Sequence, residues 1–318
     1  MPLVSVIIPL YNKEPYIGRT INSLLVQTIS DFEIVIINDG STDKGTNVVK
    51  NFKDSRIRLI CQQNAGVSAA RNKGIHEAKS DLVAFLDADD EWTPTFLETV
   101  LRLRGKYPEA GIYASAYLFC DSEGEKRIAN YREIPPAPWE GLLKSYFLSA
   151  AKGEHPVCSS AVCIPKKILL TEGGFKVGAW WGEDDDLWGR IALKHPVAFS
   201  WQIGAIYHQG ATNRACKREE LVEHPFIKKA EMAIINGEVQ KSIVKDLEEC
   251  VARYKIIAAV HNLYRGYPEI SRRMLKSCKT TLLYKEKLFW YFWSFVPYRV
   301  FSKIVSVKRN IKGYIKAP

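Results

Sequence analysis

The chain has 318 residues, of which 47% are hydrophobic and 25% charged. This balance excludes a disordered chain, and the length suggests about two domains that fold without disulfide or metal cross-links. The 45 lysines and arginines exceed the 35 aspartates and glutamates, and the net charge of +10 raises the question of a nucleic-acid or membrane partner.

The positive charge is concentrated at the end of the chain. Residues 272–318 contain 12 lysines and arginines and a single acid, Glu286. Residues 1–271 carry a net charge of −1. The basicity is therefore a property of this tail, and the body of the protein is nearly neutral.

The cysteines and the N-terminal residues bear on the cellular compartment. Seven cysteines, none in a C-x-x-C pair, are typical of a reduced, cytoplasmic protein. The first residues lack a basic segment followed by a cleavage site, so we expect no signal peptide. No stretch reaches the roughly 20 apolar residues of a membrane-spanning helix.

Apolar runs and helical periodicity alternate through the first 120 residues. Apolar, β-branched runs predict buried strands at residues 4–9 and 33–37, and further strands are predicted at 56–61, 81–86 and 112–120. Apolar residues at helical spacing predict intervening helices at residues 16–26, 44–52, 67–78 and 95–106. This alternation indicates an α/β fold with parallel crossovers, in which ligands bind at the carboxyl ends of the strands. Polar clusters beginning at Tyr11, Asp39 and Asp87 stand at such ends.

The rest of the chain is less regular. Residues 121–138 are polar and contain three prolines, which predicts a loop. Strands are predicted at 156–165, 197–201 and 205–208, and a helix at 183–194. Beyond about Arg218 the pattern is helical to the end. We therefore predict two domains, 1–215 and 216–318.

Asp87-Ala88-Asp89-Asp90 follows the predicted strand at 81–86. Two carboxylates two residues apart can share a hard divalent cation, with water and substrate phosphates completing its coordination. The alternative is that Asp90 or Thr93 caps the helix expected to begin near Pro94. An isolated D-x-D is common by chance, so the tripeptide alone does not decide between these interpretations.

Four consecutive acids, Glu183 to Asp186, open the predicted helix at 183–194. A helix N-terminus stabilises acids, but four of them exceed what capping needs because they repel one another. A carboxylate within reach of a substrate proton can act as a general base. One of these acids could do so.

Several other side chains each have two interpretations. Asp39 could bind a nucleoside or close a turn. Arg71 could pair with a phosphate or be a solvated helix charge. His208 could be a metal ligand or a strand histidine with ordinary partners. Trp180 and Trp181 could stack on a sugar ring or fill the core.

The ordered series of these motifs resembles the family 2 glycosyltransferases, which have the nucleotide-sugar-binding GT-A fold. The matching segments are residues 4–12 (VSVIIPLYN), 27–43 with FEIVIINDGSTD, 64–72 (NAGVSAARN), the D-x-D at 87–90, and 173–190 with GGF and GEDDDLWGR. The resemblance covers about residues 3–214. It implies a Rossmann-like mixed sheet flanked by helices, followed here by a C-terminal helical region.

The resemblance also implies roles for particular residues. The nucleotide sugar would be bound by Pro9, Tyr11, Asn12, Asp39, Asn64, Arg71, Asp87 and Ala88. Asp89 would bind the metal, Mn²⁺ or Mg²⁺, with His208 as a weaker second candidate. Asp184 would be the general base on the acceptor hydroxyl, with Glu183 beside it. Trp180 and Trp181 would contact the acceptor.

The implied reaction is inverting transfer of a sugar from a nucleotide-diphosphate sugar to a hydroxyl of a saccharide or lipid-linked saccharide in cell-surface glycan synthesis. The family most often uses UDP donors. Two other classes remain: a metal-dependent phosphohydrolase or nucleotidyltransferase, and an inactive membrane-associated adaptor. The former does not explain the second acid cluster, and the joint presence of Asp87, Asp89 and Asp184 speaks against the latter.

Basic and aromatic residues alternate in the tail, residues 272–318. Residues 288–296 are apolar except Ser294, but too short to span a bilayer. This composition suits an interfacial segment on an anionic bilayer. The alternatives are a helical subdomain with its aromatics packed inward, and single-stranded nucleic acid. We predict docking on the inner face of the cytoplasmic membrane, and no nucleic-acid partner.

Overall fold

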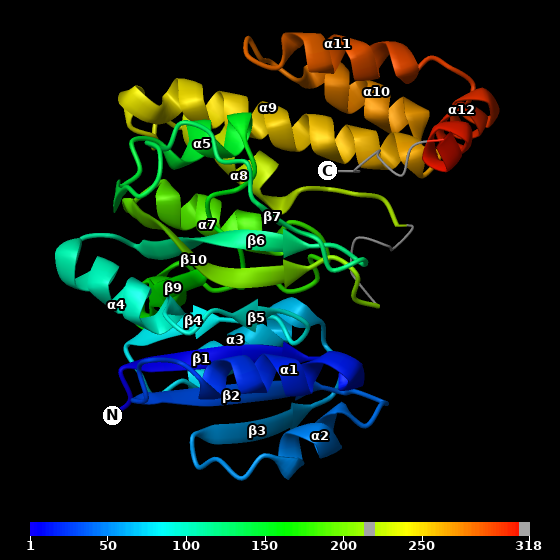
Figure 1. The fold of residues 1–318 in the computed structure, drawn as a ribbon. Coiled ribbons are helices and arrows are strands. Elements are labelled where there is room, and N and C mark those ends of the chain that lie inside the picture. Colours follow the sequence, from blue (N-terminus) through cyan, green and yellow to red (C-terminus); the bar gives the residue numbers. More distant parts are fainter. Residues whose placement is uncertain (213–219, 312–318) are drawn as a thin grey trace. The chain divides into compact units, whose positions relative to one another are not determined.

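The computed structural model describes residues 1–212 and 220–311, with side chains placed as far as Ile304. The chain divides into two compact units, Met1–Ala215 and Cys216–Pro318 (Figure 1).

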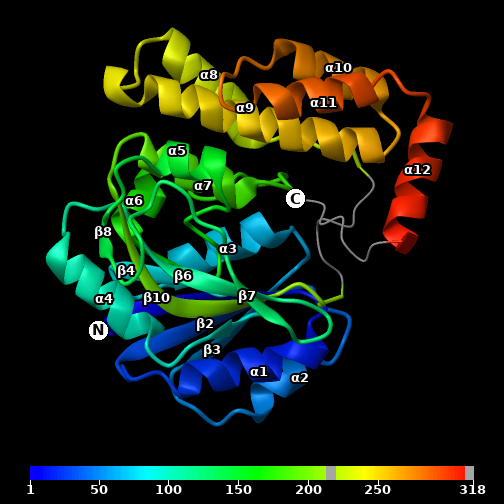
Figure 2. The ribbon, with the colours of Figure 1, turned by 45° about the horizontal axis from the view of Figure 1, so that its top comes forward.

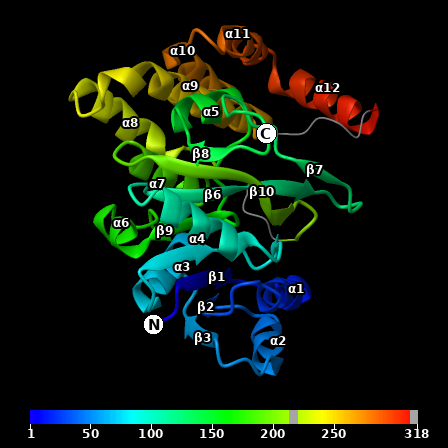
Figure 3. The same cartoon turned by 60° about the vertical axis from the view of Figure 1, so that its left-hand side comes forward.

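The first unit is built on one mixed sheet. Its strands run in the order β3-β2-β1-β4-β9-β6-β10-β5, with β7 paired to β6 and β8 to β10 (Figure 3). The strands are β1 (Val4–Leu10), β2 (Phe32–Asp39), β3 (Ile57–Gln62), β4 (Leu82–Phe85), β5 (Glu91–Trp92), β6 (Ile112–Cys120), β7 (Lys126–Ile128), β8 (Glu140–Leu142), β9 (Val162–Pro165) and β10 (Val197–His208).

The first four strands confirm the predicted parallel crossovers. β1 pairs in parallel with β2 and with β4, and β2 pairs in parallel with β3. Every residue of β2 is buried, as expected for a parallel strand covered on both faces. Because these strands are parallel, the polar residues that follow β1, β2 and β4 lie along one edge of the sheet.

Past β4 the sheet becomes mixed. β9 lies antiparallel between β4 and β6, and β5 lies antiparallel to β10. The strand predicted at 156–165 is too long, because only its last residues form β9. The two strands predicted at 197–201 and 205–208 are one continuous strand, β10. Its register against β6 shifts on either side of Ile203. A Cβ on Gly204 would lie 2.1 Å from Ser115 Oγ, so this irregular stretch requires a residue without a side chain.

Helices cover both faces of the sheet (Figure 2). The helices of this unit are α1 (Glu14–Leu25), α2 (Gly45–Asn51), α3 (Val67–Glu77), α4 (Phe96–Lys106), α5 (Tyr146–Lys152), α6 (Lys166–Thr171) and α7 (Glu183–Ala192). α3 packs so closely on β1 that a Cβ on Gly74 would lie 2.4 Å from Ile7 Cγ2. α5 and α6 were not predicted, since neither is long enough to show a clear helical period.

The second unit is helical. Its helices are α8 (Pro225–Ile235), α9 (Lys241–Tyr264), α10 (Pro268–Ser277), α11 (Tyr284–Trp293) and α12 (Tyr298–Ile311). Its apolar core comprises Ala252, Ile256, Ala259, Val260, Leu275 and Cys278. Within residues 1–212 and 220–311, none of the helices combines the length and apolar character needed to cross a bilayer.

Candidate active site

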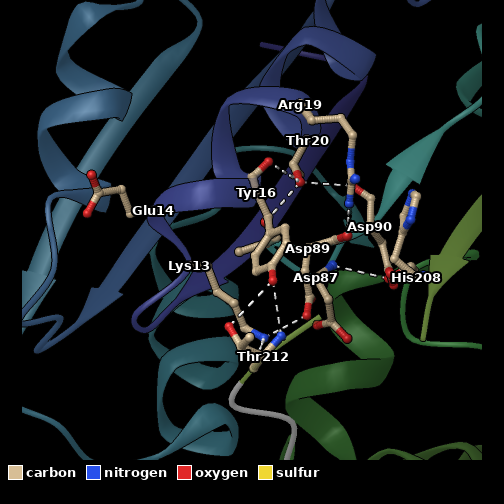
Figure 4. A network of polar contacts seen from close by, with 12 residues as sticks. Lys13, Glu14, Tyr16, Arg19, Thr20, Asp87, Asp89, Asp90, His208 and Thr212 are labelled. Carbon is tan, nitrogen blue, oxygen red and sulfur yellow. Dashed lines mark hydrogen bonds and ion pairs between the residues drawn. The ribbon is translucent and has the colours of Figure 1, made fainter. Parts of the chain in front are cut away.

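The loop after β4 carries the predicted D-x-D and is held by helix α1. The Thr20 hydroxyl lies 2.9 Å from the carbonyl oxygen of Ala88 and 2.8 Å from that of Asp90. Arg19 Nη2 donates to the carbonyl oxygen of Asp89 at 2.6 Å (Figure 4). These contacts fix the backbone of the loop, so the carboxylates are held in place by a helix more than 60 residues earlier in the chain.

Asp89, the predicted metal ligand, pairs with Lys13 (Figure 4). Lys13 Nζ lies 2.6 Å from Asp89 Oδ2 and 2.8 Å from the carbonyl oxygen of Thr212. The Thr212 amide donates to the Tyr16 hydroxyl at 3.1 Å, and hydrogen bonds with Thr212 lower the pKa of Tyr16. We did not predict a role for Lys13, because a lysine after a strand carries no sequence signature.

Asp90 is 1% exposed and is not a helix cap. Its Oδ2 accepts a hydrogen bond from the Ser160 hydroxyl at 2.5 Å, and its Oδ1 accepts one from the backbone amide of His208 at 2.8 Å. Burial, and then repulsion by Asp89 and Asp87, raises its pKa well above the ordinary range. The capping interpretation of Asp90 and Thr93 was wrong: α4 begins at Phe96, without a side-chain cap.

His208 reaches the D-x-D loop through its backbone. Its ring Nε2 lies 2.6 Å from Glu91 Oε1, and burial lowers its pKa. The ring therefore has a carboxylate partner on β5 in this structure. A role as metal ligand stays a prediction.

A buried arginine joins the two acid clusters. Arg71, on α3, is 3% exposed. Its Nη2 lies 2.7 Å from Asp87 Oδ1 and its Nη1 lies 3.0 Å from Glu183 Oε1. Burial alone would lower its pKa, but Asp87, Glu183 and Asp184 together raise it. The interpretation of Arg71 as a solvated helix charge was wrong, and two motifs separated by 96 residues in sequence meet at one guanidinium.

The four acids that open α7 have four different partners. Glu183 pairs with Arg71, Asp184 Oδ2 accepts from the Ser159 hydroxyl at 3.0 Å, and Asp185 Oδ1 lies 2.9 Å from His155 Nδ1. Asp186 Oδ2 lies 2.9 Å from guanidinium nitrogens of Arg190. This divergence is how four consecutive acids coexist on one helical turn.

The pKa values of the first two acids are raised. Burial, followed by repulsion from Asp184, raises the pKa of Glu183 to about 7, against the effect of Arg71. Burial and repulsion by Asp185 raise the pKa of Asp184, and the hydrogen bond from Ser159 acts in the opposite direction. Perturbed carboxyl groups of this kind concentrate at functional sites.

Ser159 and Ser160 connect the second acid cluster to the first. Ser159 donates to Asp184, and the Ser160 hydroxyl donates to Asp90 and accepts from the Asp87 amide at 3.2 Å. Sequence analysis missed both serines, because it placed them inside a strand at 156–165. Two hydroxyl residues just before an apolar run were the only signal available.

The loop containing Gly173-Gly174-Phe175 is clamped from both sides. Asn72, next to Arg71 on α3, donates to the carbonyl oxygen of Phe175 and accepts from its amide, both at 2.8 Å. Arg190, on α7, donates to the carbonyl oxygen of Gly174 at 2.7 Å. Gly174 has φ 67°, and a Cβ added at this position would lie 2.4 Å from Asn72 Oδ1. This loop therefore locks α3 to α7.

The residues predicted to bind the nucleoside lie along the carboxyl edge of β1 and β2. Asn12 Oδ1 accepts from the Thr42 amide at 2.8 Å. Asp39 is 2% exposed and accepts from the amides of Ala65 and Gly66, both at 2.9 Å. The Asp39 carboxylate thus holds the loop after β3 in addition to any ligand role.

The other nucleotide-side residues flank this edge. Asn64 Nδ2 donates to the carbonyl oxygen of Asp39 at 3.0 Å. Tyr11 is exposed, whereas Pro9 and both Trp180 and Trp181 are half-buried. The tryptophans are therefore not part of the fully buried core, and they stand immediately before α7.

The carboxylates at this site fit a hard divalent cation in part. In the parts of the chain that the structure describes, no group of three or more histidine, cysteine or acidic side chains is arranged to hold a metal. Asp87 and Asp89 each engage one carboxylate oxygen with a cationic side chain. Carboxylate oxygens are ligands that Mg²⁺ and Mn²⁺ prefer, and one or two of them commonly suffice where substrate phosphates complete the shell.

The sequence model of the family described as "Glycosyl transferase family 2" matches residues 5–164, about half of the chain. The chain belongs to this family. The 92 residues that match the uncharacterized glycosyltransferase EpsJ of Bacillus subtilis are 48% identical and span 28% of this chain and 27% of EpsJ. Glycosyltransferase GlyA of Streptococcus pneumoniae serotype 4 is 39% identical over 123 residues, which span 38% of this chain and 18% of GlyA. The matches thus span less than a third of either relative.

Solved structures of low sequence identity share the fold. S. aureus TarS 1-349 in complex with UDP-GlcNAc aligns with a TM-score of 0.66 and 17% identity, covering 88% of this chain and 82% of that one. The mannosyltransferase PcManGT of Pyrobaculum calidifontis, in complex with GDP-Man and Mn²⁺, aligns with a TM-score of 0.60 and 16% identity, covering 96% and 86%. The GT-A fold predicted for this family 2 chain is confirmed.

The buried ion pairs of Arg71 generate a stability prediction. Arg71→Met leaves Asp87 and Glu183 without their cation, so we expect the free energy of unfolding to fall by about 3–5 kcal/mol at pH 8. Arg58→Met is the matched control: Arg58 also pairs with two acids, Glu33 and Glu77, but its side chain is 30% exposed, and its loss costs about 1 kcal/mol or less. Urea unfolding measures both. Equal losses in the two variants would contradict the central role of Arg71.

Proposed function

We propose that this chain is an inverting glycosyltransferase that moves a sugar from a nucleotide-diphosphate sugar, of UDP type, to a hydroxyl of a saccharide or lipid-linked saccharide. The observation that carries the proposal is the double ion pair of Arg71, which brings Asp87 of the D-x-D loop and Glu183 of α7 to one point. In this proposal Asp87 lies on the donor side and Glu183 on the acceptor side, so the two sides are adjacent. Membership of family 2 supports the same conclusion.

In this proposal the donor lies along the carboxyl edge of β1, β2 and β4. The exposed ring of Tyr11 stacks on the base, and Asp39 and Asn12 bind base and ribose while holding the adjoining loops. Pro9, Asn64, Arg71, Asp87 and Ala88 complete the donor site. A nucleotide-sugar donor is supported by the likeness to TarS, which was solved with UDP-GlcNAc.

Asp89 is the proposed metal ligand, with His208 as a second candidate after its ring leaves Glu91. A divalent cation bound there would act as a Lewis acid that neutralises the charge of the leaving diphosphate. PcManGT, which shares the fold, was solved with Mn²⁺. The chain's own contribution is to hold the loop of Asp89 rigid through Thr20 and Arg19.

Asp184 is the proposed general base. Its carboxylate takes the proton of the acceptor hydroxyl as that oxygen bonds to the anomeric carbon and the bond from this carbon to the diphosphate oxygen breaks. A single displacement of this kind inverts the anomeric centre. A carboxylate with a raised pKa is a better proton acceptor near neutral pH than an ordinary one, and burial raises the pKa of Asp184. Glu183 orients the acceptor beside it.

The acceptor is proposed to lie on the α7 side of the site. Trp180 and Trp181, half-buried just before α7, offer rings on which a sugar can stack. We place the reaction in the cytoplasm, at the inner face of the membrane, where lipid-linked saccharides of cell-surface glycans are built.

Replacing the proposed base tests the mechanism directly. We expect Asp184→Asn to reduce transfer at least about a thousandfold, because proton transfer is lost while the shape of the site is kept. Thermal stabilisation by the nucleotide sugar should stay close to that of the unchanged protein. Asp185→Asn, one residue along α7, is the control: it removes a repulsion that raises the pKa of Asp184 but keeps the proposed base, so it should keep most of its transfer above neutral pH. Near-normal turnover of Asp184→Asn would remove Asp184 from this role, and donor hydrolysis without any acceptor would favour a phosphohydrolase.

Arg71 and, more weakly, the hydrogen bond from Ser159 lower the pKa of Asp184, so Ser159 helps to define the pH range in which the proposed base works. Asp184 must be deprotonated, so kcat/KM falls as the pH drops through its pKa. Ser159→Ala removes a bond that lowers this pKa, and we therefore expect the acidic limb of the profile to move to higher pH. Ser159→Thr keeps the hydroxyl and should leave the limb in place. An even loss of rate at every pH in Ser159→Ala would show that Ser159 is merely structural.

Metal dependence tests the role of Asp89. Exhaustive chelation should abolish transfer, and added Mn²⁺ or Mg²⁺ should restore it. Asp89→Asn should raise the metal concentration needed for half-maximal rate by about tenfold or more, whereas Asp31→Asn, an exposed aspartate before β2, should not. Full activity after chelation would contradict the assignment of Asp89.

A further inference from the structure

Helix α11 is apolar on both of its faces. Its inner face packs on the core of the second unit through Trp290 and Tyr291, beside α9 and α10 (Figure 1). The opposite side carries Leu288, Phe289 and Phe292, of which Phe289 is 53% and Phe292 69% exposed. A helix with one packed face normally presents polar residues on the other. The second apolar face is therefore not explained by the packing of this unit.

The exposed apolar surface continues past the end of α11. Phe295, just beyond the helix, and Val300 and Ile304, on α12, are also exposed. We call Leu288, Phe289 and Phe292 the outer face. Large exposed side chains gathered in one segment are uncommon on a chain surrounded only by water, and indicate a contact surface.

The surroundings of the outer face are cationic. Lys285, Arg299 and Lys303 are exposed. Glu286, the single acid of residues 272–318, is already paired with Arg253, whose Nη1 lies 3.0 Å from both carboxylate oxygens. The tail therefore carries a large excess of lysines and arginines over acids.

We propose that the outer face docks on an anionic lipid bilayer, with its rings and aliphatic side chains at the level of the headgroups and its lysines and arginines on lipid phosphates. Aromatic and aliphatic residues flanked by basic ones are the composition of interfacial helices. A second copy of this chain fits less well, because each tail carries +11. Single-stranded nucleic acid could stack on Phe289 and Phe292, but it fits less well because the exposed aliphatic side chains Leu288, Val300 and Ile304 would stay in contact with water.

This proposal does not rest on the transfer reaction, so vesicle binding tests it separately. The full chain is sedimented with vesicles of phosphatidylcholine, alone or mixed with phosphatidylglycerol. We expect at least about tenfold stronger binding to the anionic vesicles, weakening as salt is added. If the unchanged chain binds anionic vesicles but transfers no sugar, the proposed reaction is contradicted and the proposed docking is not.

The apolar contribution is tested by Phe289→Gln with Phe292→Gln. Both side chains are exposed, so the fold should be kept, as circular dichroism checks. We expect vesicle binding to fall about tenfold or more. Met232→Gln with Ile235→Gln is the matched control, since these α8 side chains are 47% and 76% exposed in the same unit. The control should bind vesicles as the unchanged chain does.

The charge contribution has its own matched pair of variants. Lys285→Glu, Arg299→Glu and Lys303→Glu together should abolish the preference for anionic vesicles. The control reverses the same number of exposed lysines elsewhere in the unit: Lys228→Glu, Lys229→Glu and Lys241→Glu. It should keep most of the preference for anionic vesicles.

Three results would overturn the proposal. One is equal vesicle binding by the outer-face variants and their controls. Another is a single-stranded oligonucleotide that binds the chain more tightly than vesicles do and displaces them. The third is a combination of two findings: the unchanged chain does not bind vesicles, and it forms a dimer in analytical ultracentrifugation. The double variant Phe289→Gln with Phe292→Gln would then be monomeric.

Discussion

The buried guanidinium of Arg71 is the contact on which the arrangement of the candidate site depends. An arginine shielded from water is tolerated only when carboxylates compensate its charge. Here one carboxylate comes from the loop after β4 and the other from the first turn of α7. Neither can move away without leaving a charge unpaired, so this ion pair holds the donor side and the acceptor side of the proposed site at a constant separation.

The neighbouring contacts extend this constraint to the rest of the first unit. Asn72 forms hydrogen bonds with both the amide and the carbonyl oxygen of Phe175. Arg190, on α7, donates to the carbonyl oxygen of Gly174 in the same loop and also pairs with Asp186. The glycine-rich loop is thereby explained as a joint between α3 and α7. Glycine is needed there because Gly174 has a positive φ and approaches Asn72 closely. The Gly173-Gly174-Phe175 motif thus has a structural reason that is independent of any ligand.

The polar network also shows how strongly acidic segments remain folded. Asp90 and Asp184 are each bonded to a serine of one dipeptide, Ser159-Ser160, and the acids of α7 point to different partners. Repulsion is reduced because the carboxylates diverge, and the repulsion and burial that remain appear as raised pKa values. Carboxyl groups with raised pKa values are suited to accept protons near neutral pH, so the electrostatic cost of the cluster and its proposed chemistry have one origin.

The sequence by itself determined the parallel half of the sheet, the D-x-D loop, the acid-rich helix and the position of the basic tail. These features are local: continuous apolar runs, helical periodicity and residue clusters a few positions long reveal them. Only the tertiary structure decided that Arg71 is buried between two acid clusters, that Asp90 binds Ser160 and is not a helix cap, that Lys13 pairs with Asp89, and that β9 runs antiparallel. It also separated the two apolar faces of α11. These facts depend on contacts between residues far apart in the chain, for which a short sequence pattern carries no signal.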